Sequence, residues 1–585
     1  MSADNNSASQ AARAVPSAVD VVVIGAGFAG LYAHHKLRQL GLKAFGFEAA
    51  SDIGGTWYWN RYPGARCDVE SLDYSYSFSP ELLDEWHWSE RFATQPEILQ
   101  YANHVAERFG LRRDYAFETR VTSCSFDEAA NQWLVRTDRG DEVRCRYLFS
   151  AVGCLSLPKP PEVAGLEQFK GRWVQTGCWP HEPVDVAGKR VAVIGTGSSG
   201  IQSIPILAEQ AAQLTVFQRT PNFSVPAHNG PIDPLYEAQI RADYVAHAKR
   251  NRMTRGGFPQ RIATGLPAMS VSEEERQAKF EEAWAFGTFA LQSVFIDISS
   301  NPESNAAATA FVHMKIRAAV NDPALADRLM PRTFPFGTKR LCLDTDYYAT
   351  FNRDNVELVD IRAEPIECIT RAGIKTSAKE YPFDLIVFAT GFDAITGPLL
   401  ALNITGTGGR SLKDEWRHGP QSYLGLMIAG FPNLFTVNGP SSPSVLTNML
   451  QSIEHHVEWI ADCIAHMEAH GIARIDADEA AQSAWAQEVA AIADMTLYTK
   501  ADSWYMGANV PGKPRLFMAY IAGLDRYIER CDAIVRDGYA GFKFSHQSAD
   551  VAISGGVIAG VGQVTGSARE EIDARGRQHA PAERP

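Results

Sequence analysis

Two stretches of the chain nearly repeat one another, and they limit the possible folds more than any other feature. Both are apolar runs that end in three glycines: Gly25, Gly27 and Gly30 in VDVVVIGAGFAG, and Gly195, Gly197 and Gly200 in KRVAVIGTGSSG. A helical pattern and a further strand follow each run, which is the context that a G-x-G-x-x-G pattern requires. Glycine lets the backbone approach a pyrophosphate, whose charge is met by amides at the helix N-terminus. The sequence therefore predicts an α/β fold with two Rossmann-like dinucleotide-binding domains.

The end of the second strand in each unit indicates which nucleotide is held. Glu48 stands about twenty residues after Gly30, where a carboxylate accepts hydrogen bonds from ribose hydroxyls, and this favours FAD. Arg219 takes the same place after Gly200, with Thr220 beside it, and a guanidinium there suits the 2'-phosphate of NADP. Solvated charges at strand ends are the alternative interpretation, but their place inside paired units argues against it. An FAD unit with an NADPH unit indicates a flavin-dependent oxidoreductase.

Composition excludes several other classes of protein. The chain has 585 residues, 45% of them hydrophobic, which suffices for two or three domains. Its formal net charge of -13 argues against a general affinity for nucleic acid or anionic lipid. The nine cysteines show no C-x-x-C spacing, so we expect reduced thiols, no metal site and no disulfide-reductase chemistry. Because signal-peptide and membrane-span patterns are not found either, we expect a cytoplasmic protein.

The order of the motifs predicts two interrupted nucleotide domains. Strand patterns followed by a glycine turn end at Gly153 and again at Gly391, where the chain is expected to leave the first domain and return to it. The stretch SEEERQAKFEEAWAFGTFALQ has helical spacing. The expected division is a flexible N-terminus, 1–20; an FAD-binding domain, 21–153 and 392–545; an NADP-binding domain, 154–225 and 336–391; a helical insertion, 226–335; and a mobile C-terminal tail, 546–585.

Further motifs give the chain a family resemblance. They are GGTWYWNRYPGARCDVES, WSERFATQPEIL, FKGRWVQTGCWP, GTKR, FATGFDA, PSSPSVLTNM and SWYMGANVPGKPR. From about Val21 to Phe544 the sequence resembles the type I Baeyer-Villiger monooxygenases, and most of all their steroid and phenylacetone monooxygenase branch. The resemblance implies an enzyme that uses NADPH, FAD and O2, through a C4a-peroxyflavin, to convert a ketone into an ester or lactone.

The resemblance indicates bulky, cyclic or aryl ketones, without selecting one, and leaves the oligomeric state open. A heteroatom (S/N) oxygenase or an uncoupled NADPH oxidase is the alternative within the same flavoprotein class. A flavin-binding module without turnover is a third hypothesis, against which the retained Arg340, Asp68 and glycine turns argue.

The resemblance also implies roles for individual residues. Arg340, in GTKR, is expected to be the fixed cation beside the flavin that stabilises the anionic peroxide and adduct, and Asp68 is expected to hold it there. The expected FAD contacts are Asp68, Thr56, Trp57, Tyr74 and Met449. The expected NADP contacts, beside Arg219 and Thr220, are Ser198, Ser199, Gln202, Lys339, Arg340 and Trp504. The expected substrate pocket contains Ser444, Val445, Leu446 and Trp504.

One position departs from the family pattern. The connector keeps Phe169, Gly171, Trp179 and Pro180 but has Gln175 where the family has histidine. Glutamine retains a donor and an acceptor but cannot become a cation near neutral pH. Our hypothesis is that this position ties backbone segments together during domain movement and does no proton chemistry. The departure puts coupling in question, because a looser connector would let the peroxide decay.

Overall fold

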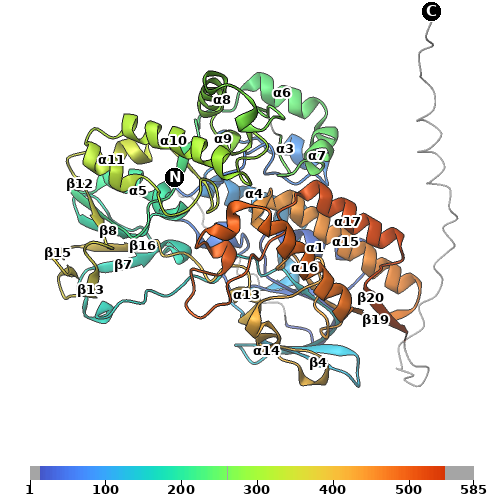
Figure 1. The fold of residues 1–585 in the computed structure, drawn as a ribbon. Helices are drawn as coiled ribbons and strands as arrows, with labels where there is room; N and C mark the ends of the chain where they lie inside the picture. Colours follow the sequence, from blue (N-terminus) through green and yellow to red (C-terminus); the bar gives the residue numbers. More distant parts are fainter. Residues whose placement is uncertain (1–13, 260, 547–585) are drawn as a thin grey trace, which may run out of the picture. The chain divides into compact units, whose positions relative to one another are not determined.

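The first of two main sheets contains the first glycine turn. The computed structural model describes residues 14–259 and 261–546 (Figure 1). In spatial order this sheet consists of β17 (Ile404–Thr405), β4 (Val121–Asp127), β5 (Gln132–Thr137), β6 (Glu142–Ser150), β1 (Ala18–Ile24), β2 (Ala44–Phe47) and β3 (Tyr115–Ala116), with β18 (Leu434–Thr436) beside the end of β6. Strand β1 is parallel to β2 and β6. Because Ala18 and Val19 pair with β6, residues 18–20 are strand, which corrects the expectation that they are flexible.

The second main sheet contains the second glycine turn. Its five strands are all parallel, in the order β12 (Val356–Asp360), β9 (Gln213–Gln218), β8 (Arg190–Ile194), β16 (Leu385–Phe388) and β7 (Arg172–Gln175). The apolar side chains of β8 and β16 are buried on both faces, as expected for parallel strands that are covered by other elements. Both sheets combine strands from two separate stretches of chain. The predicted α/β class with two dinucleotide folds is confirmed, whereas the domain boundaries remain a prediction.

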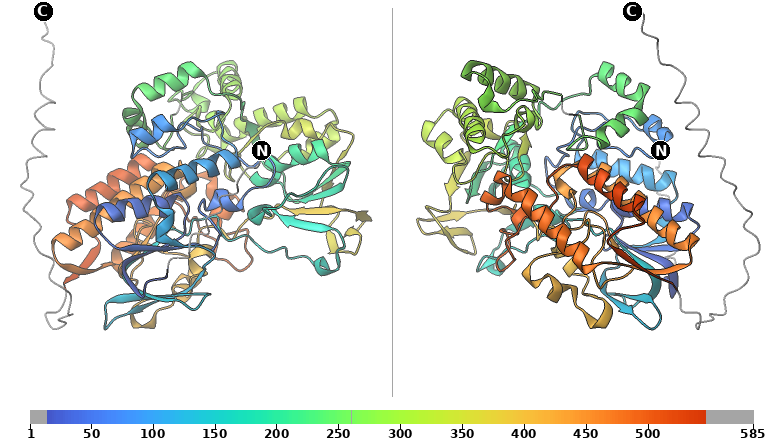
Figure 2. Two further views of the ribbon diagram at one scale, coloured as in Figure 1. Left: turned by 180° about the vertical axis from the view of Figure 1, so that it is seen from behind. Right: turned by 45° about the vertical axis from the view of Figure 1, so that its right-hand side comes forward.

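Helices pack against both main sheets. Helix α1 (Phe28–Gln39) follows β1 and packs against α15 (Met449–Ala469), and α17 (Leu524–Arg536) runs beside α15 (Figures 1 and 2). Helix α5 (Ser198–Gln210) follows β8. The other helices outside the insertion are α2 (Thr56–Trp59), α3 (Pro80–Glu85), α4 (Gln95–Arg108), α12 (Tyr347–Thr350), α13 (Gly397–Leu400), α14 (Leu412–Glu415) and α16 (Glu479–Asp494). Small sheets are formed by β10 (Ser224–Pro226) with β11 (Cys342–Asp344), by β13 (Ile366–Ile369), β14 (Gly373–Thr376) and β15 (Glu380–Pro382), and by β19 (Ile472–Ala477) with β20 (Phe542–His546).

The expected helical insertion divides between two hydrophobic cores. Its helices are α6 (Pro234–Ala242), α7 (Tyr244–Arg252), α8 (Glu273–Phe286), α9 (Ala290–Ser293), α10 (Pro302–Ala319) and α11 (Pro323–Leu329). Ile240 and Tyr244, from the first two helices, are buried in the core of the first sheet. Phe280 and Phe311, from α8 and α10, are buried in the core of the second sheet. The insertion therefore spans both sheets instead of forming a separate packed unit.

The two segments of chain that cross between the sheets are hydrogen-bonded to each other. Residues 154–159 and 391–395, here called the crossing pair, run antiparallel. The amide of Ile395 donates to the carbonyl of Cys154 (2.7 Å), and the amide of Lys159 donates to the carbonyl of Gly391 (3.0 Å). The sheets are thus joined by a two-stranded ribbon.

No helix of the described residues is long and apolar enough to cross a membrane. All nine cysteines lie in the described part of the chain and are free thiols. The C-terminal tail that was expected to be mobile lies outside the described residues, apart from its first residue.

Candidate active site

The first glycine turn is a closed cradle built around Glu48. A Cβ on Gly30 would lie 1.9 Å from the carbonyl oxygen of Gly25, so only glycine fits at this position in the first turn of α1. Gly27 faces Gly55, at the start of GTWYW, where an added Cβ on Gly55 would lie 2.8 Å from the Gly27 Cα. The Glu48 carboxylate accepts hydrogen bonds from the amides of Ala26 (2.7 Å) and Ala50 (2.8 Å). The cradle therefore leaves backbone space for a pyrophosphate and places a carboxylate beside it, which fits the expected FAD.

The Glu48 carboxylate is buried, with 7% of the residue exposed. Burial raises its pKa, and the hydrogen bonds from backbone amides oppose that rise. Since each carboxylate oxygen can accept more than one hydrogen bond, the residue can hold the turn and still accept from ribose hydroxyls.

The second glycine turn has the same backbone but is open. A Cβ on Gly200 would lie 2.3 Å from the Gly195 carbonyl oxygen, repeating the close approach of the first turn. Gly197 and Ser198 are exposed, and a Cβ on Gly197 would meet no atom within 4 Å. The N-terminus of α5, with Ser198 and the half-buried Ser199, is therefore accessible to an anion.

Gln202 uses its amide within the protein. The Tyr62 hydroxyl donates to its Oε1 (2.7 Å), and its Nε2 donates to the Arg66 carbonyl (3.1 Å). Its position on α5 agrees with the predicted NADP contact, but these bonds give it a structural role between α5 and residues 62–66.

Three cations gather at the end of strand β9. They are Arg219, Lys339 and Arg362. Arg219 is exposed, Lys339 is half-buried, and Arg362 donates through Nη2 to the Thr220 hydroxyl (2.8 Å). Burial lowers the pKa of Lys339, and the positive charges of Arg219 and Arg362 lower it further. Like charges in such proximity favour binding of a dianion, and the 2'-phosphate of NADP is the group that fits.

Arg340 is fixed by two partners on different segments. Its Nε and Nη2 donate to Oδ2 of Asp68 (2.9 and 2.7 Å), and its Nη1 donates to the Val445 carbonyl (2.6 Å). Burial disfavours the charged guanidinium, but Asp68 outweighs this and raises the pKa of Arg340, so the side chain stays a cation. The predicted pairing of Arg340 with Asp68 is present in the structure, and Val445 is an additional partner.

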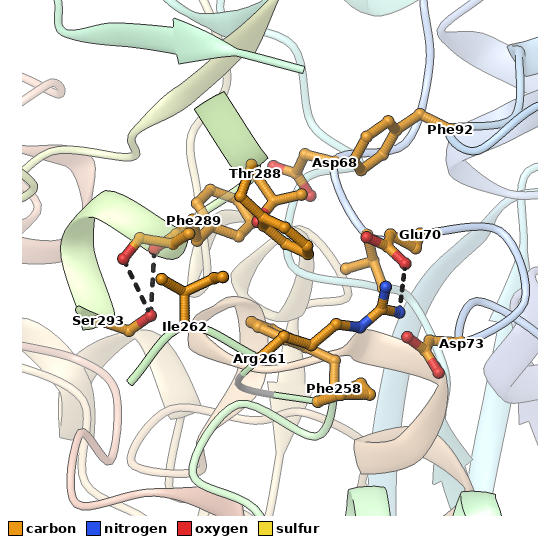
Figure 3. Close-up of a pocket in the computed structure, with 14 residues that line it drawn as sticks. Asp68, Glu70, Asp73, Phe92, Phe258, Arg261, Ile262, Thr288, Phe289 and Ser293 are labelled. Carbon is orange, nitrogen blue, oxygen red and sulfur yellow. Dashed lines mark hydrogen bonds and ion pairs between the residues drawn. The ribbon is translucent and has the colours of Figure 1, made fainter. Parts of the chain in front are cut away.

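A pocket lies next to this ion pair. Its lining includes Asp68, Val69 and the aromatic rings of Phe258, Phe286 and Phe289 (Figure 3). Arg340 is not among the lining residues, but its guanidinium carbon lies 5.2 Å from the centre of the Phe289 ring, which is. Figure 3 shows Arg261 extending along the pocket to Glu70, to which it is bonded (2.8 Å). The pocket is therefore lined mainly by apolar side chains, four of them phenylalanines, together with three acidic residues and Arg261.

Of the predicted site residues only Asp68 lines this pocket, and none of the predicted substrate-pocket residues does. Trp57 and Tyr74 are buried, and the Trp57 indole donates to the Tyr74 hydroxyl (3.1 Å). Thr56 is exposed at the start of α2, and Met449 is half-buried at the start of α15. Ser444, Val445 and Leu446 form a short 3-10 turn before Met449. Trp504 is half-buried and lies against Tyr505, with 4.2 Å between ring centres.

The connector is an edge strand followed by a short turn. Its strand, β7, ends at Gln175 and pairs with β16. The buried Gln175 side chain donates through Nε2 to the Lys159 carbonyl. The Trp179 amide donates to the Trp59 carbonyl (3.3 Å), and a Cβ on Gly171 would lie 2.6 Å from the Asp384 carbonyl oxygen. Phe169 is buried and Pro180 half-buried. The connector thus contacts both the second sheet and the first nucleotide cradle.

Three contributors to the site were missed by the sequence interpretation. They are Arg362 among the cations, the Val445 carbonyl as a partner of Arg340, and Tyr505, which is buried against Arg340. Burial raises the pKa of the Tyr505 hydroxyl, and the charge of Arg340 opposes this rise. In the sequence, only its place directly after the predicted site residue Trp504 could have indicated a role for Tyr505.

Known proteins resemble this chain over most of its length. Residues 19–255 match the family model described as pyridine nucleotide-disulphide oxidoreductase. A Baeyer-Villiger monooxygenase of Pseudooceanicola batsensis is 44% identical over 526 residues, covering 89% of this chain and 95% of that protein. The phenazine N-monooxygenase PhzNO1 of Lysobacter antibioticus is 41% identical over 529 residues, covering 89% and 96%. A solved structure of an oxidized steroid monooxygenase bound to NADP has a TM-score of 0.87 and 52% identity, and covers 91% of this chain and 100% of that one.

Proposed function

This chain belongs to the Baeyer-Villiger monooxygenases, and from that premise we propose that it oxygenates bulky, cyclic or aryl ketones in the pocket beside Arg340. It is an NADPH- and FAD-dependent enzyme that gives esters or lactones. When bound, FAD reduced by NADPH supplies the oxygen atom that is taken from O2. The observation that carries the proposal is the guanidinium of Arg340, held by Asp68 and Val445, since Asp68 and the Phe289 ring beside Arg340 both line the pocket.

Arg340 has the properties that a stabiliser of developing negative charge requires. Of the five N–H donors of an arginine, three are used by Asp68 and Val445, and a further hydrogen bond joins the side chain to Tyr505, which leaves one for a substrate oxygen. The two anchors lie on different segments of the chain, so the fork is oriented before a substrate arrives. A cation oriented in advance stabilises an oxyanion without further reorganisation.

The lining of the pocket supports the proposed substrate class, whereas its cavity of about 40 Å³ must widen to admit a bulky ketone. Rings of Phe258, Phe286 and Phe289 offer an apolar surface to a cyclic or aryl group. Asp68 and Glu70 also line the pocket, but they are paired with Arg340 and Arg261, so charge alone does not select against a carboxylate. The proposed substrate class therefore rests on the apolar lining.

A panel of ketones tests this proposal when NADPH loss and product mass are measured together. We expect ester or lactone from cyclic and aryl ketones, and a loss of oxygenation of roughly 10²- to 10³-fold in Arg340→Ala. Arg340→Lys serves as the matched control, because it keeps the charge but loses the fork. Unchanged ester formation in Arg340→Ala would contradict the role of this side chain.

The similarity to an N-monooxygenase makes heteroatom oxygenation the second candidate. It predicts N- or S-oxide from amine and sulfide substrates and no ester from any ketone of the panel. Hydrogen peroxide equal to the NADPH consumed would instead identify an uncoupled oxidase. We also propose a cytoplasmic location, which the nine free thiols support.

A further inference from the structure

We propose that Lys159, Asn509 and Gln175 position the loop of residues 501–515 and thereby hold Tyr505 against Arg340. The inference depends on the proposed role of Arg340 and concerns residues that have so far been given no part in it. It assigns a function to the polar contacts between this loop and the crossing pair.

The loop contributes to the surroundings of the catalytic cation but has little regular structure of its own. It contains a single 3-10 turn, Trp504–Met506. Tyr505 is 2% exposed, lies in contact range of the Tyr498 and Phe517 rings, and faces the charge of Arg340. If the loop moved, Arg340 would lose a buried neighbour and gain solvent.

The far side of the loop is held by hydrogen bonds to the crossing pair. Lys159 Nζ donates to the carbonyl of Asn509 (2.5 Å), and Asn509 Nδ2 donates to the carbonyl of Phe392 (2.7 Å). Lys513 Nζ donates to Oδ1 of Asp393 (2.6 Å) and to the carbonyl of Ala394 (2.7 Å). Both strands of the crossing pair therefore hold the loop, residues 154–159 through Lys159 and residues 391–395 through Phe392, Asp393 and Ala394.

Gln175 connects this arrangement to the second sheet. Its Nε2 donates to the carbonyl of Lys159, whose side chain in turn holds Asn509. The chain of contacts thus runs from the end of β7, through Lys159 and the loop, to Tyr505 and Arg340. Gln175, which stands where the family has histidine, thus has the Lys159 carbonyl as its partner, and this carbonyl requires only a hydrogen-bond donor.

The Lys159 contact favours a positioning role over a purely stabilising one. Its ammonium group is half-buried and donates to a backbone carbonyl, and no carboxylate of the described residues lies within ion-pair distance. Withdrawing an ammonium from water without a countercharge gains little stability. The contact instead fixes the position of the Asn509 backbone.

Hydrogen exchange of residues 501–515 in the purified full-length enzyme tests the proposal without depending on turnover. In Lys159→Met, which keeps the side-chain length and removes the donor, we expect exchange in this loop to be roughly tenfold faster, as for loss of one hydrogen bond from a charged donor. Lys170→Met is the matched control, because Lys170 is an exposed lysine of the connector, and it should exchange like the wild type. Gln175→Ala should act in the same direction as Lys159→Met, and Gln175→His should restore protection because it can donate again.

The second measurement is the release of hydrogen peroxide per NADPH with a ketone that the wild type oxygenates. Lys159→Met should raise this ratio several-fold while Lys170→Met leaves it unchanged. Equal loop exchange in Lys159→Met and wild type would overturn the inference. Should Lys159→Met fail to fold, Asn509→Ala removes the contact to Phe392 and must give the same faster exchange. A wild type that forms no ester would refute the proposed function, and the exchange result would still stand by itself.

Discussion

The two glycine turns share one backbone design and differ in how charge is placed around them. In the first, the buried Glu48 is bonded to the amides of Ala26 and Ala50, so its charge is part of the cradle itself. In the second, the charges are positive, and Arg219 and Arg362 are exposed. The difference teaches that the first cradle is built to retain its nucleotide, whereas the second attracts one that must arrive and leave in each cycle.

The largest effect should come from removing the carboxylate of the first cradle. Glu48→Ala leaves two buried amides without acceptors, each at a cost of roughly 1–3 kcal/mol, and also removes the ribose acceptor. We expect the purified variant to contain little FAD and to melt at a lower temperature. Flavin absorbance per protein and thermal unfolding measure this, with the exposed Glu107→Ala as control. Full flavin content in Glu48→Ala would show that the cradle does not depend on this charge.

A smaller and more selective effect is expected in the second cradle. Arg219→Ala should raise the KM for NADPH by roughly 10- to 100-fold, as for loss of a charged hydrogen-bond partner, and leave that for NADH nearly unchanged. Flavin content should stay at the wild-type level, because the first cradle is untouched. Steady-state kinetics with both coenzymes provide the measurement. Equal losses for NADPH and NADH would mean that Arg219 does not recognise the 2'-phosphate.

The pH dependence of NADPH binding should sharpen the contrast further. Burial and the charge of Arg219 lower the pKa of Lys339, so this cation loses its proton at a lower pH than an ordinary lysine does. The KM for NADPH should therefore rise as the pH increases through that range. In Arg219→Ala the pKa of Lys339 increases, and the rise in KM should move to higher pH. An identical midpoint in both proteins would speak against the coupling of these two cations.

The smallest effect on activity is expected at the connector, which contacts both halves of the molecule but carries neither the carboxylate of the first cradle nor the cations of the second. Gln175→His retains a donor for the Lys159 carbonyl, so the pH profile of ketone oxygenation should stay nearly unchanged. The appearance of a new titration near the histidine pKa of about 6.5 would refute the hypothesis that this position does no proton chemistry. Oxygenation rates across the pH range for both proteins decide the matter.

Features that depend on residues close together in the sequence could be predicted from it. The glycine turns, Glu48 and Arg219 follow from strand, turn and helix in succession, and each lies where the spacing indicated. Arg340 and Asp68 are 272 residues apart, and only the family resemblance brought them together in advance. The division of the insertion between two cores could not be predicted, since helical spacing does not tell which core a helix joins.

The missed residues depend on strand order and on backbone atoms. Arg362 reaches Thr220 only because β12 pairs with β9, and a sequence does not state which parallel strands are neighbours. The Val445 contact is made by a carbonyl oxygen, which every residue possesses, so no residue type signals it. Gln202 lies on α5 as expected, but the sequence did not show that its side-chain amide is hydrogen-bonded to Tyr62 and Arg66.

The division of the insertion between two cores has a mechanical consequence for substrate selection. Helix α7 is anchored to the first core, where Arg252 bonds the fully buried Glu454 (2.9 Å), and α8 is anchored to the second. The segment between them, residues 253–272, supplies Phe258, Arg261 and Ile262 to the pocket wall. A rotation of one sheet against the other would displace this segment as well as the crossing pair. We therefore expect the shape of the pocket, and with it the choice of ketone, to depend on the angle between the two sheets.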